Sequence, residues 1–209
     1  MRVVFANAFG RQVAETLHSR RGATRTEWNP LDPDDDPLRS WDGEFIAFAL
    51  GRPYPNASRR LSSELTGRRV RWSAAVIRDR YLFCGPLHKP GAGACWDCFQ
   101  RRSLALAIPP RSPEREQALD GAYNQTSGEM LSSFLPPTVL MAASMLSVHA
   151  DEADDLPPGA LTACDLLEGS VVSTRVVPLH GCACRGERAH TQDDRFTSRL
   201  IDCLKEEDQ

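Results

Sequence analysis

Two tight pairs of cysteines, far apart in the chain, constrain the fold more than any other feature of the sequence. Two residues separate Cys95 from Cys98, and one residue separates Cys182 from Cys184. The chain has seven cysteines, an odd number, and lacks an export signal, so a disulfide framework is disfavoured. Zn²⁺ prefers four thiolate or imidazole ligands in a tetrahedron. The sequence therefore predicts a zinc site that brings the two pairs together and ties two distant segments.

The sequence leaves the fourth ligand of this site open. A single residue between Cys182 and Cys184 is unusual for a zinc knuckle, and His180 lies two residues before Cys182. His180 could therefore replace Cys184 as a ligand. In either case all four ligands are protein side chains, which is typical of a structural site, because a catalytic zinc keeps one position open for water. We expect this zinc to stabilise the fold and to carry out no chemistry.

The first cysteine pair, Cys95-Trp96-Asp97-Cys98, also fits the C-x-x-C pattern of thioredoxin-like redox sites. Such redox pairs lie at the N-terminus of a helix in a specific βαβ unit. Here the pair lies deep in the chain and a second cysteine pair is its evident partner, so metal binding is favoured. The remaining cysteines lie in apolar strand or helix patterns and are predicted core residues, namely Cys84, Cys164 and Cys203.

The first half of the chain alternates between strand and helix patterns. These patterns predict strands at residues 2–6, 44–50, 70–77 and 81–87, and helices at residues 10–19 and 58–66. The continuous apolar run at 44–50 suits a strand that is buried on both faces, as in a parallel sheet. Residues 28–42, rich in Pro and Asp, predict a surface loop. This order of elements favours an α/β fold.

The second half of the chain is richer in helix and then forms a hairpin. Helices are predicted at residues 112–124, 136–148 and 195–204, and a hairpin at residues 161–167 and 171–179. The second cysteine pair directly follows the hairpin. We therefore expect a single domain, 1–209, with an α/β half (1–90), a zinc-tied helical and hairpin half (91–192), and a C-terminal helix or tail (193–209).

Charge and hydropathy argue against two classes of partner. Lys and Arg number 25 against 28 Asp and Glu, and this net charge of −3 disfavours nucleic-acid binding, which needs clustered positive charge. The longest apolar-leaning stretch, residues 134–148, contains Pro136 and Pro137 and is shorter than the roughly 20 apolar residues of a membrane span. The N-terminus lacks the apolar core of a signal peptide. We expect a cytoplasmic protein that binds neither nucleic acid nor membrane.

The first strand–helix junction has the outline of a dinucleotide-binding loop without its glycines. In the pattern G-x-G-x-x-G, glycines let the backbone approach a phosphate at the start of the helix. With Gly10 as the last glycine of the pattern, Phe5 and Asn7 occupy its first two positions. The sequence has no P-loop, nucleophile elbow or H-E-x-x-H motif, and its histidines are scattered. We expect neither catalytic residues nor a bound nucleotide cofactor.

The segment FCGPLHKPGAGACWDC, from Phe83 to Cys98, resembles the G-P-(apolar)-x-x-P-G-x-G-x-C-x-x-C segment of ThiF-like proteins, which have the fold of ubiquitin-activating enzymes. More narrowly, it is similar to the ThiF-like cyclodehydratase partner in the biosynthesis of thiazole/oxazole-modified peptides. In that family a helical stretch, a hairpin and a second cysteine pair, often preceded by His, follow the first pair, which fits Leu161 to Cys184 here. The run EFIAFALGRP, residues 44–53, fits the family's buried strand.

The resemblance implies a degenerate ThiF-like domain of the Rossmann type with a structural zinc knot and a late hairpin. Proteins of this family work beside a YcaO-type enzyme, which uses ATP to activate backbone amides of a ribosomally made precursor peptide. The ThiF-like partner commonly lacks adenylating activity and serves in leader-peptide binding or as an activating scaffold. Because this chain has no room for the family's N-terminal peptide-recognition domain, we expect a truncated form, with the leader bound by this chain or by a separate polypeptide.

The expected function is therefore a non-catalytic partner of a YcaO-type enzyme in this branch of natural product biosynthesis, and homodimerisation is left open. A ThiF-like adenylyltransferase and a zinc-stabilised interaction module are the alternatives. An extended peptide or partner strand could add to the edge of the hairpin at residues 161–179. Five arginines could meet an acidic leader peptide, although a solubilising role is the simpler interpretation; they are Arg68, Arg69, Arg71, Arg78 and Arg80.

Overall fold

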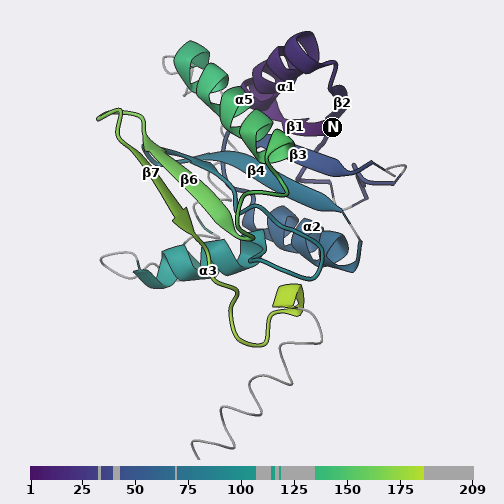
Figure 1. Ribbon diagram of the computed structural model, residues 1–209, viewed down its shortest axis with the longest axis vertical. Coiled ribbons are helices and arrows are strands. Elements are labelled where there is room, and N and C mark those ends of the chain that lie inside the picture. Colours follow the sequence, from purple (N-terminus) through teal and green to yellow (C-terminus); the bar gives the residue numbers. More distant parts are fainter. Residues whose placement is uncertain are drawn as a thin grey trace, which may run out of the picture.

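In the part of the chain that the structure describes, seven strands form one mixed sheet in the order β2-β1-β3-β4-β5-β6-β7 (Figure 1). The structure is a computed structural model, and it describes residues 1–32, 34–39, 43–68, 70–106, 114–115, 118 and 135–185. The strands are β1 (Arg2–Ala6), β2 (Thr24–Glu27), β3 (Phe45–Leu50), β4 (Arg71–Arg78), β5 (Tyr81–Cys84), β6 (Ala160–Asp165) and β7 (Val171–Arg175). Strands β1 to β4 run parallel to one another, and β5, β6 and β7 extend the sheet, each antiparallel to its neighbours.

Helices cover both faces of this sheet. They are α1 (Asn7–Arg21), α2 (Pro55–Gly67), α3 (Trp96–Leu106) and α5 (Leu135–Asp151), with a short 3₁₀ helix η2 (Ala183–Arg185) near the end of the described chain. Figure 1 shows α1 and α5 on one face and α2 and α3 on the other. The mixed α/β architecture predicted from the sequence is therefore confirmed. No helix among the described residues is long and apolar enough to cross a membrane.

Strand β3 is the centre of the parallel part of the sheet. All six of its residues are buried, and it pairs in parallel with β1 on one side and β4 on the other. Because side chains alternate along a strand, Ile46 and Phe48 join the core under α2 and α3, whereas Phe45 and Ala47 join the core under α1 and α5. The strand buried on both faces, predicted from the run of apolar residues, is confirmed.

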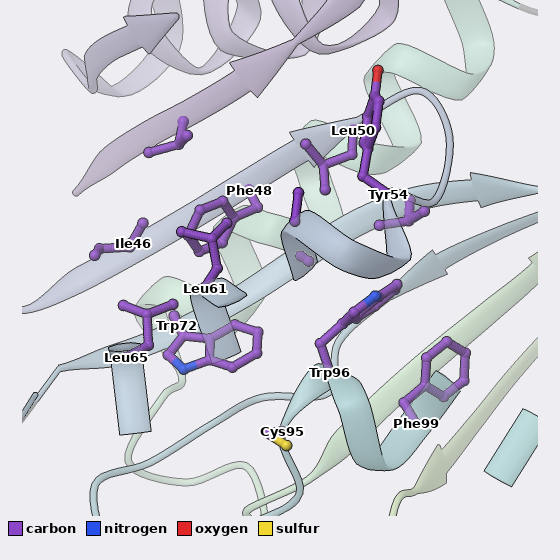
Figure 2. Packing of buried hydrophobic residues seen from close by; sticks show 14 of the residues in the cluster. Ile46, Phe48, Leu50, Tyr54, Leu61, Leu65, Trp72, Cys95, Trp96 and Phe99 are labelled. Carbon is purple, nitrogen blue, oxygen red and sulfur yellow. The ribbon is translucent and has the colours of Figure 1, made fainter. Parts of the chain in front are cut away.

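The core under α2 and α3 is rich in aromatic side chains (Figure 2). The rings of Phe48 and Trp72 meet edge to face with their centroids 6.1 Å apart, and those of Trp96 and Phe99 lie 5.0 Å apart. Such pairs stabilise a core by about 1 kcal/mol beyond the area that they bury. Trp96 and Phe99 belong to the first turn of α3, so this aromatic layer fixes the start of the helix and Cys95, which directly precedes it.

The structure corrects several of the sequence predictions. Residues 28–42 are not simply a surface loop, because Trp28 and Leu38 are fully buried among the polar residues that surround them. Helix α3 begins at Trp96, directly after Cys95, and the sequence patterns did not predict it. The strands predicted at residues 70–77 and 81–87 pair as β4 and β5, and the predicted hairpin of β6 with β7 is confirmed. The predicted helix at 195–204 and most of that at 112–124 lie outside the described residues.

A buried histidine lies between the sheet and α5. His149 of α5 and Ser73 of β4 are both buried, and Nδ1 of His149 lies 2.7 Å from Oγ of Ser73, within hydrogen-bonding distance. Burial lowers the pKa of His149 to about 4. In the unfolded chain the pKa of a histidine is about 6.5, so the unfolded state binds more protons between these two pH values. Stability contributed by neutral His149 is therefore lost as the pH falls from about 6.5 to 4.

We predict that His149→Asn removes part of the acid sensitivity of folding. An asparagine side chain can still hydrogen-bond to Ser73 but does not titrate, and the pKa difference corresponds to roughly 3 kcal/mol at most. Urea unfolding at pH 7 and at pH 4.5 should therefore show a smaller loss of unfolding free energy in His149→Asn than in the wild type. The control is His18→Asn, at an exposed position of α1. Equal losses in the two variants would contradict the prediction.

Candidate metal centre

The first cysteine pair lies at the N-terminus of α3. Cys95 directly precedes the helix, and Cys98 is its third residue, so both side chains lie on the first turn. A tight turn leads into the helix, and Gly93 adopts a φ of +87° there. A Cβ atom at Gly93 would lie 2.9 Å from the backbone nitrogen of Gly159, a contact too short to be tolerated. The glycine thus lets this turn pack against the start of β6.

The second cysteine pair lies at the end of a segment that we call the strap, residues 176–182, which follows β7. The backbone N–H of Cys182 donates to the carbonyl of Leu179 over 3.2 Å, in a turn that leads into η2. Cys184 belongs to η2 and is buried, whereas Cys182 is half-buried. The strap thus carries the second pair from the edge of the sheet to the first turn of α3.

The four sulfur atoms gather in one cluster. All four Sγ atoms lie within 4.8 Å of one another. The shorter separations are 3.7 Å for Cys95–Cys98, 3.7 Å for Cys95–Cys182, 3.5 Å for Cys98–Cys184 and 3.3 Å for Cys182–Cys184. A tetrahedral zinc ion with Zn–S bonds of about 2.3 Å would separate its sulfur ligands by about 3.8 Å. The cluster could therefore hold a metal ion with little rearrangement.

The environment of Cys98 favours its thiolate, the form that binds metals. Hydrogen bonds from the thiols of Cys184 and Cys95 lower the pKa of Cys98, and the backbone N–H of Leu179 contributes by donating to its Sγ over 3.3 Å. Interactions with Cys184 and Cys98, together with burial, raise the pKa of Cys95. Crowded thiols thus deprotonate one at a time, and a cation at their centre would favour the deprotonated form of all four.

The structure places the other residues singled out from the sequence as follows. His180 is exposed and does not belong to the sulfur cluster. Cys84 and Cys164 are buried in the core, as predicted, and Cys203 lies outside the described residues. The pair Cys95 and Cys98 does begin a helix, as a redox site would require, but the second cysteine pair lies against it. This contact favours metal binding over redox chemistry.

Two side chains meet at the place where a Rossmann-type sheet would bind a nucleotide. This place lies at the carboxyl ends of β1 and β3, where the strand order reverses. Asn7 has a φ of +64°, and its Oδ1 accepts a hydrogen bond from the backbone N–H of Gly10 over 3.2 Å. Its Nδ2 donates to the hydroxyl of Tyr54, also over 3.2 Å. One of the N–H groups that would face a phosphate at the start of α1 is therefore already used.

Gly10 keeps one function of the dinucleotide-binding pattern. In that pattern the last glycine allows close packing of helix and strand. A Cβ atom at Gly10 would lie 2.2 Å from the carbonyl oxygen of Ala49 in β3, so only glycine fits between α1 and the sheet. A Cβ at Gly51 would lie 2.6 Å from Oδ1 of Asn7. The helix thus remains packed as in a nucleotide-binding fold, while Asn7 fills the space over Gly51.

The arginines considered for leader-peptide binding are engaged within the protein. Arg68 donates to the carbonyl of Leu38, Arg71 pairs with Asp154, Arg78 donates to Ser103, and Arg80 pairs with Asp165 and Glu168; Arg69 lies outside the described residues. These contacts favour the simpler structural interpretation of the arginines. Sequence reasoning did not identify Arg102, which the structure places against the strap through hydrogen bonds to two of its carbonyls.

The sequence matches no family model and no curated protein, but the fold matches several solved structures. The heterocyclase TruD aligns with a TM-score of 0.57 and 17% identity over 90% of this chain, which spans only 28% of the TruD chain. The Escherichia coli microcin synthetase McbBCD complex aligns with a TM-score of 0.56 and 14% identity, over 87% of this chain and 67% of the other.

A further match is the microcin C7 biosynthetic enzyme MccB in complex with N-formylated MccA. It aligns with a TM-score of 0.60 and 12% identity, over 88% of this chain and 67% of MccB. At such low identities the similarity concerns the fold. The chain thus has a fold similar to that found in a heterocyclase, a microcin synthetase complex and a microcin C7 biosynthetic enzyme.

Proposed function

We propose that this chain is a non-catalytic partner of a peptide-modifying enzyme in the biosynthesis of azoline- or azole-containing peptides. The observation that carries the proposal is that Asn7 bonds to Tyr54 and to the N–H of Gly10 at the place where a Rossmann-type fold would bind a nucleotide. The similarity in fold to the heterocyclase TruD and to the McbBCD complex supports this setting. The enzyme served would be of the YcaO type, which supplies ATP-dependent activation of the precursor's backbone amides, whereas this chain would supply binding.

The sulfur cluster would hold one Zn²⁺ through Cys95, Cys98, Cys182 and Cys184. Four thiolates fill a tetrahedral zinc ion and leave no position for water or substrate. The ion would therefore act structurally, by holding α3 and the strap together. Because the ligands must be brought together by folding, the free energy of binding contributes directly to the stability of the folded chain.

We predict about one zinc ion per purified chain. Elemental analysis should find it in the wild type and in Cys164→Ser, a control at a buried cysteine outside the cluster. Cys95→Ser should be insoluble or unfolded. Three thiolates would remain close together, and they could not complete the coordination shell of a zinc ion. Cys184→Ser should lose the metal and His180→Ala should keep it; the reverse would identify His180 as the fourth ligand. A folded, metal-free wild-type chain would refute the zinc site.

We predict that the chain neither binds nor hydrolyses ATP. Asn7 occupies the position of a loop glycine, and its side chain already accepts the N–H of Gly10. Isothermal titration calorimetry with Mg-ATP should therefore show no binding at micromolar concentrations. Micromolar affinity, or exchange of pyrophosphate into ATP in the presence of a peptide, would favour the adenylyltransferase instead.

The outer edge of β7 is the surface that we propose for binding an extended peptide or partner strand. It ends the described sheet, and all five of its residues are exposed. Hydrogen-bonded pairs alternate along an antiparallel ladder, and the N–H of Val176 and the carbonyl of Ser170 both bond to the β6 side. The backbone N–H and C=O groups of Val171, Ser173 and Arg175 therefore point outward, available for strand addition.

This edge would bind a peptide in extended form and bring it close to the enzyme's active site. Backbone hydrogen bonds would supply affinity, while Val171 and Val172, 54% and 59% exposed, offer apolar contacts on opposite faces of the strand. Such binding requires no chemistry from this chain. It raises the local concentration of the peptide near the enzyme that modifies it.

We predict that Ser173→Pro weakens partner or peptide binding about tenfold. Proline removes the outward N–H of Ser173 and leaves the ladder with β6 intact, because edge strands tolerate proline where the N–H faces solvent. Ser173→Ala, which keeps the N–H, is the matched control. The measurement is co-purification with the proposed YcaO-type enzyme, followed by precursor conversion with and without this chain.

The two parts of this proposal fail in different ways. Conversion at the same rate and yield without the chain would refute the partner function. Conversion that depends on the chain but is equally supported by Ser173→Pro would refute the β7 edge as the binding surface and leave the partner function standing.

A further inference from the structure

The strap, residues 176–182, connects the edge of the sheet to the second cysteine pair without regular secondary structure of its own. In Figure 1 it leaves β7, passes α3 and reaches η2. Val176 is buried and donates its N–H to the carbonyl of Gly159, but Val177 is 58% exposed. The position of Cys182 and Cys184 therefore depends on the contacts that fix the middle of the strap.

Helix α3 makes those contacts with two residues of one face. Arg102 donates from Nε to the carbonyl of Val177 over 2.7 Å and from Nη2 to the carbonyl of Pro178 over 3.2 Å. The next residue, Leu179, donates its N–H to Sγ of Cys98. Cys98 and Arg102 are four residues apart, so they lie on the same face of α3, one turn apart. Three consecutive residues of the strap are thus held by one helix face.

The guanidinium group suits this role better than another side chain would. It is planar, and its N–H donors point in fixed directions, so it can bond two neighbouring carbonyls at once. One of these carbonyls belongs to Pro178, which has no backbone N–H. The segment therefore cannot be held by a continuous ladder of backbone hydrogen bonds. Arg102 also places a positive charge on the turn next to the cluster. Four thiolates and one Zn²⁺ would carry a net charge of −2, which this cation partly offsets.

We propose that Arg102 is a positioning residue of the metal centre. By fixing the carbonyls of Val177 and Pro178, it holds the strap so that Cys182 and Cys184 face Cys95 and Cys98 and the shell closes around the ion. This inference rests on the metal centre proposed above. It makes Arg102 a determinant of how long the metal stays bound, although its hydrogen bonds go to backbone carbonyls and not to a metal ligand.

The test is the rate at which the full chain loses zinc to an excess of a chromophoric chelator. Arg102→Lys keeps the charge and loses the paired donors, and Arg102→Gln keeps a donor and loses the charge. Both should release zinc about 10- to 100-fold faster than the wild type, the range by which loss of an outer-shell contact commonly weakens metal binding. Arg101→Lys changes the exposed neighbour, which faces Asp97, and should release zinc at the wild-type rate.

Cobalt substitution separates the possible failures. The visible spectrum of the Co²⁺ form reports four-thiolate coordination, which the Arg102 variants should keep while exchanging the ion faster. Wild-type protein that binds neither zinc nor cobalt would refute the metal centre itself. A metal-loaded wild type with release rates unchanged in Arg102→Lys and Arg102→Gln would refute the positioning role alone. Should one variant be insoluble, the other decides the outcome.

Discussion

The convergence of four cysteine sulfur atoms is the interaction on which the rest of the structure depends. It joins the first turn of α3 to the segment that follows β7, and these segments lie far apart in the sequence. The strap is also attached through the hydrogen bonds to Arg102 and to Cys98. Crowded thiols without a cation do not attract one another strongly, so the metal that we propose would supply the stability of this connection.

The same connection relates the fold to the proposed function. The strap begins where β7 ends, so a fixed strap also fixes the C-terminal end of the edge strand. On the other face of the sheet, Gly10 allows α1 to pack closely against β3. There the side chain of Asn7 accepts the backbone N–H of Gly10, a group that could otherwise bind a phosphate. The fold thus combines close packing of α1 on β3 with an exposed sheet edge, and Asn7 takes up one of the N–H groups at the start of α1. Such a combination favours binding over catalysis, and the similarity in fold alone would not establish either.

Sequence patterns predicted the helices and strands that are determined by apolar runs and by local turn residues. The run at 44–50 predicted a strand buried on both faces because residues 45–50 are all apolar, and the two strand patterns at residues 161–167 and 171–179 predicted the late hairpin. Strand β2 was missed because its residues, TRTE, are polar and largely exposed, and only pairing with β1 makes them a strand. The start of α3 was missed because cysteines and a turn precede it. The contacts of Arg102 with the strap join residues far apart in sequence, which no periodicity reveals.

The most direct test of the metal centre is X-ray absorption at the zinc edge of the purified chain. The account predicts a single shell of four sulfur atoms at about 2.3 Å, with no nitrogen or oxygen ligand. Such a shell is the signature of Cys95, Cys98, Cys182 and Cys184 bound to one ion. A shell that contains nitrogen or oxygen, or a folded chain without zinc, would contradict it.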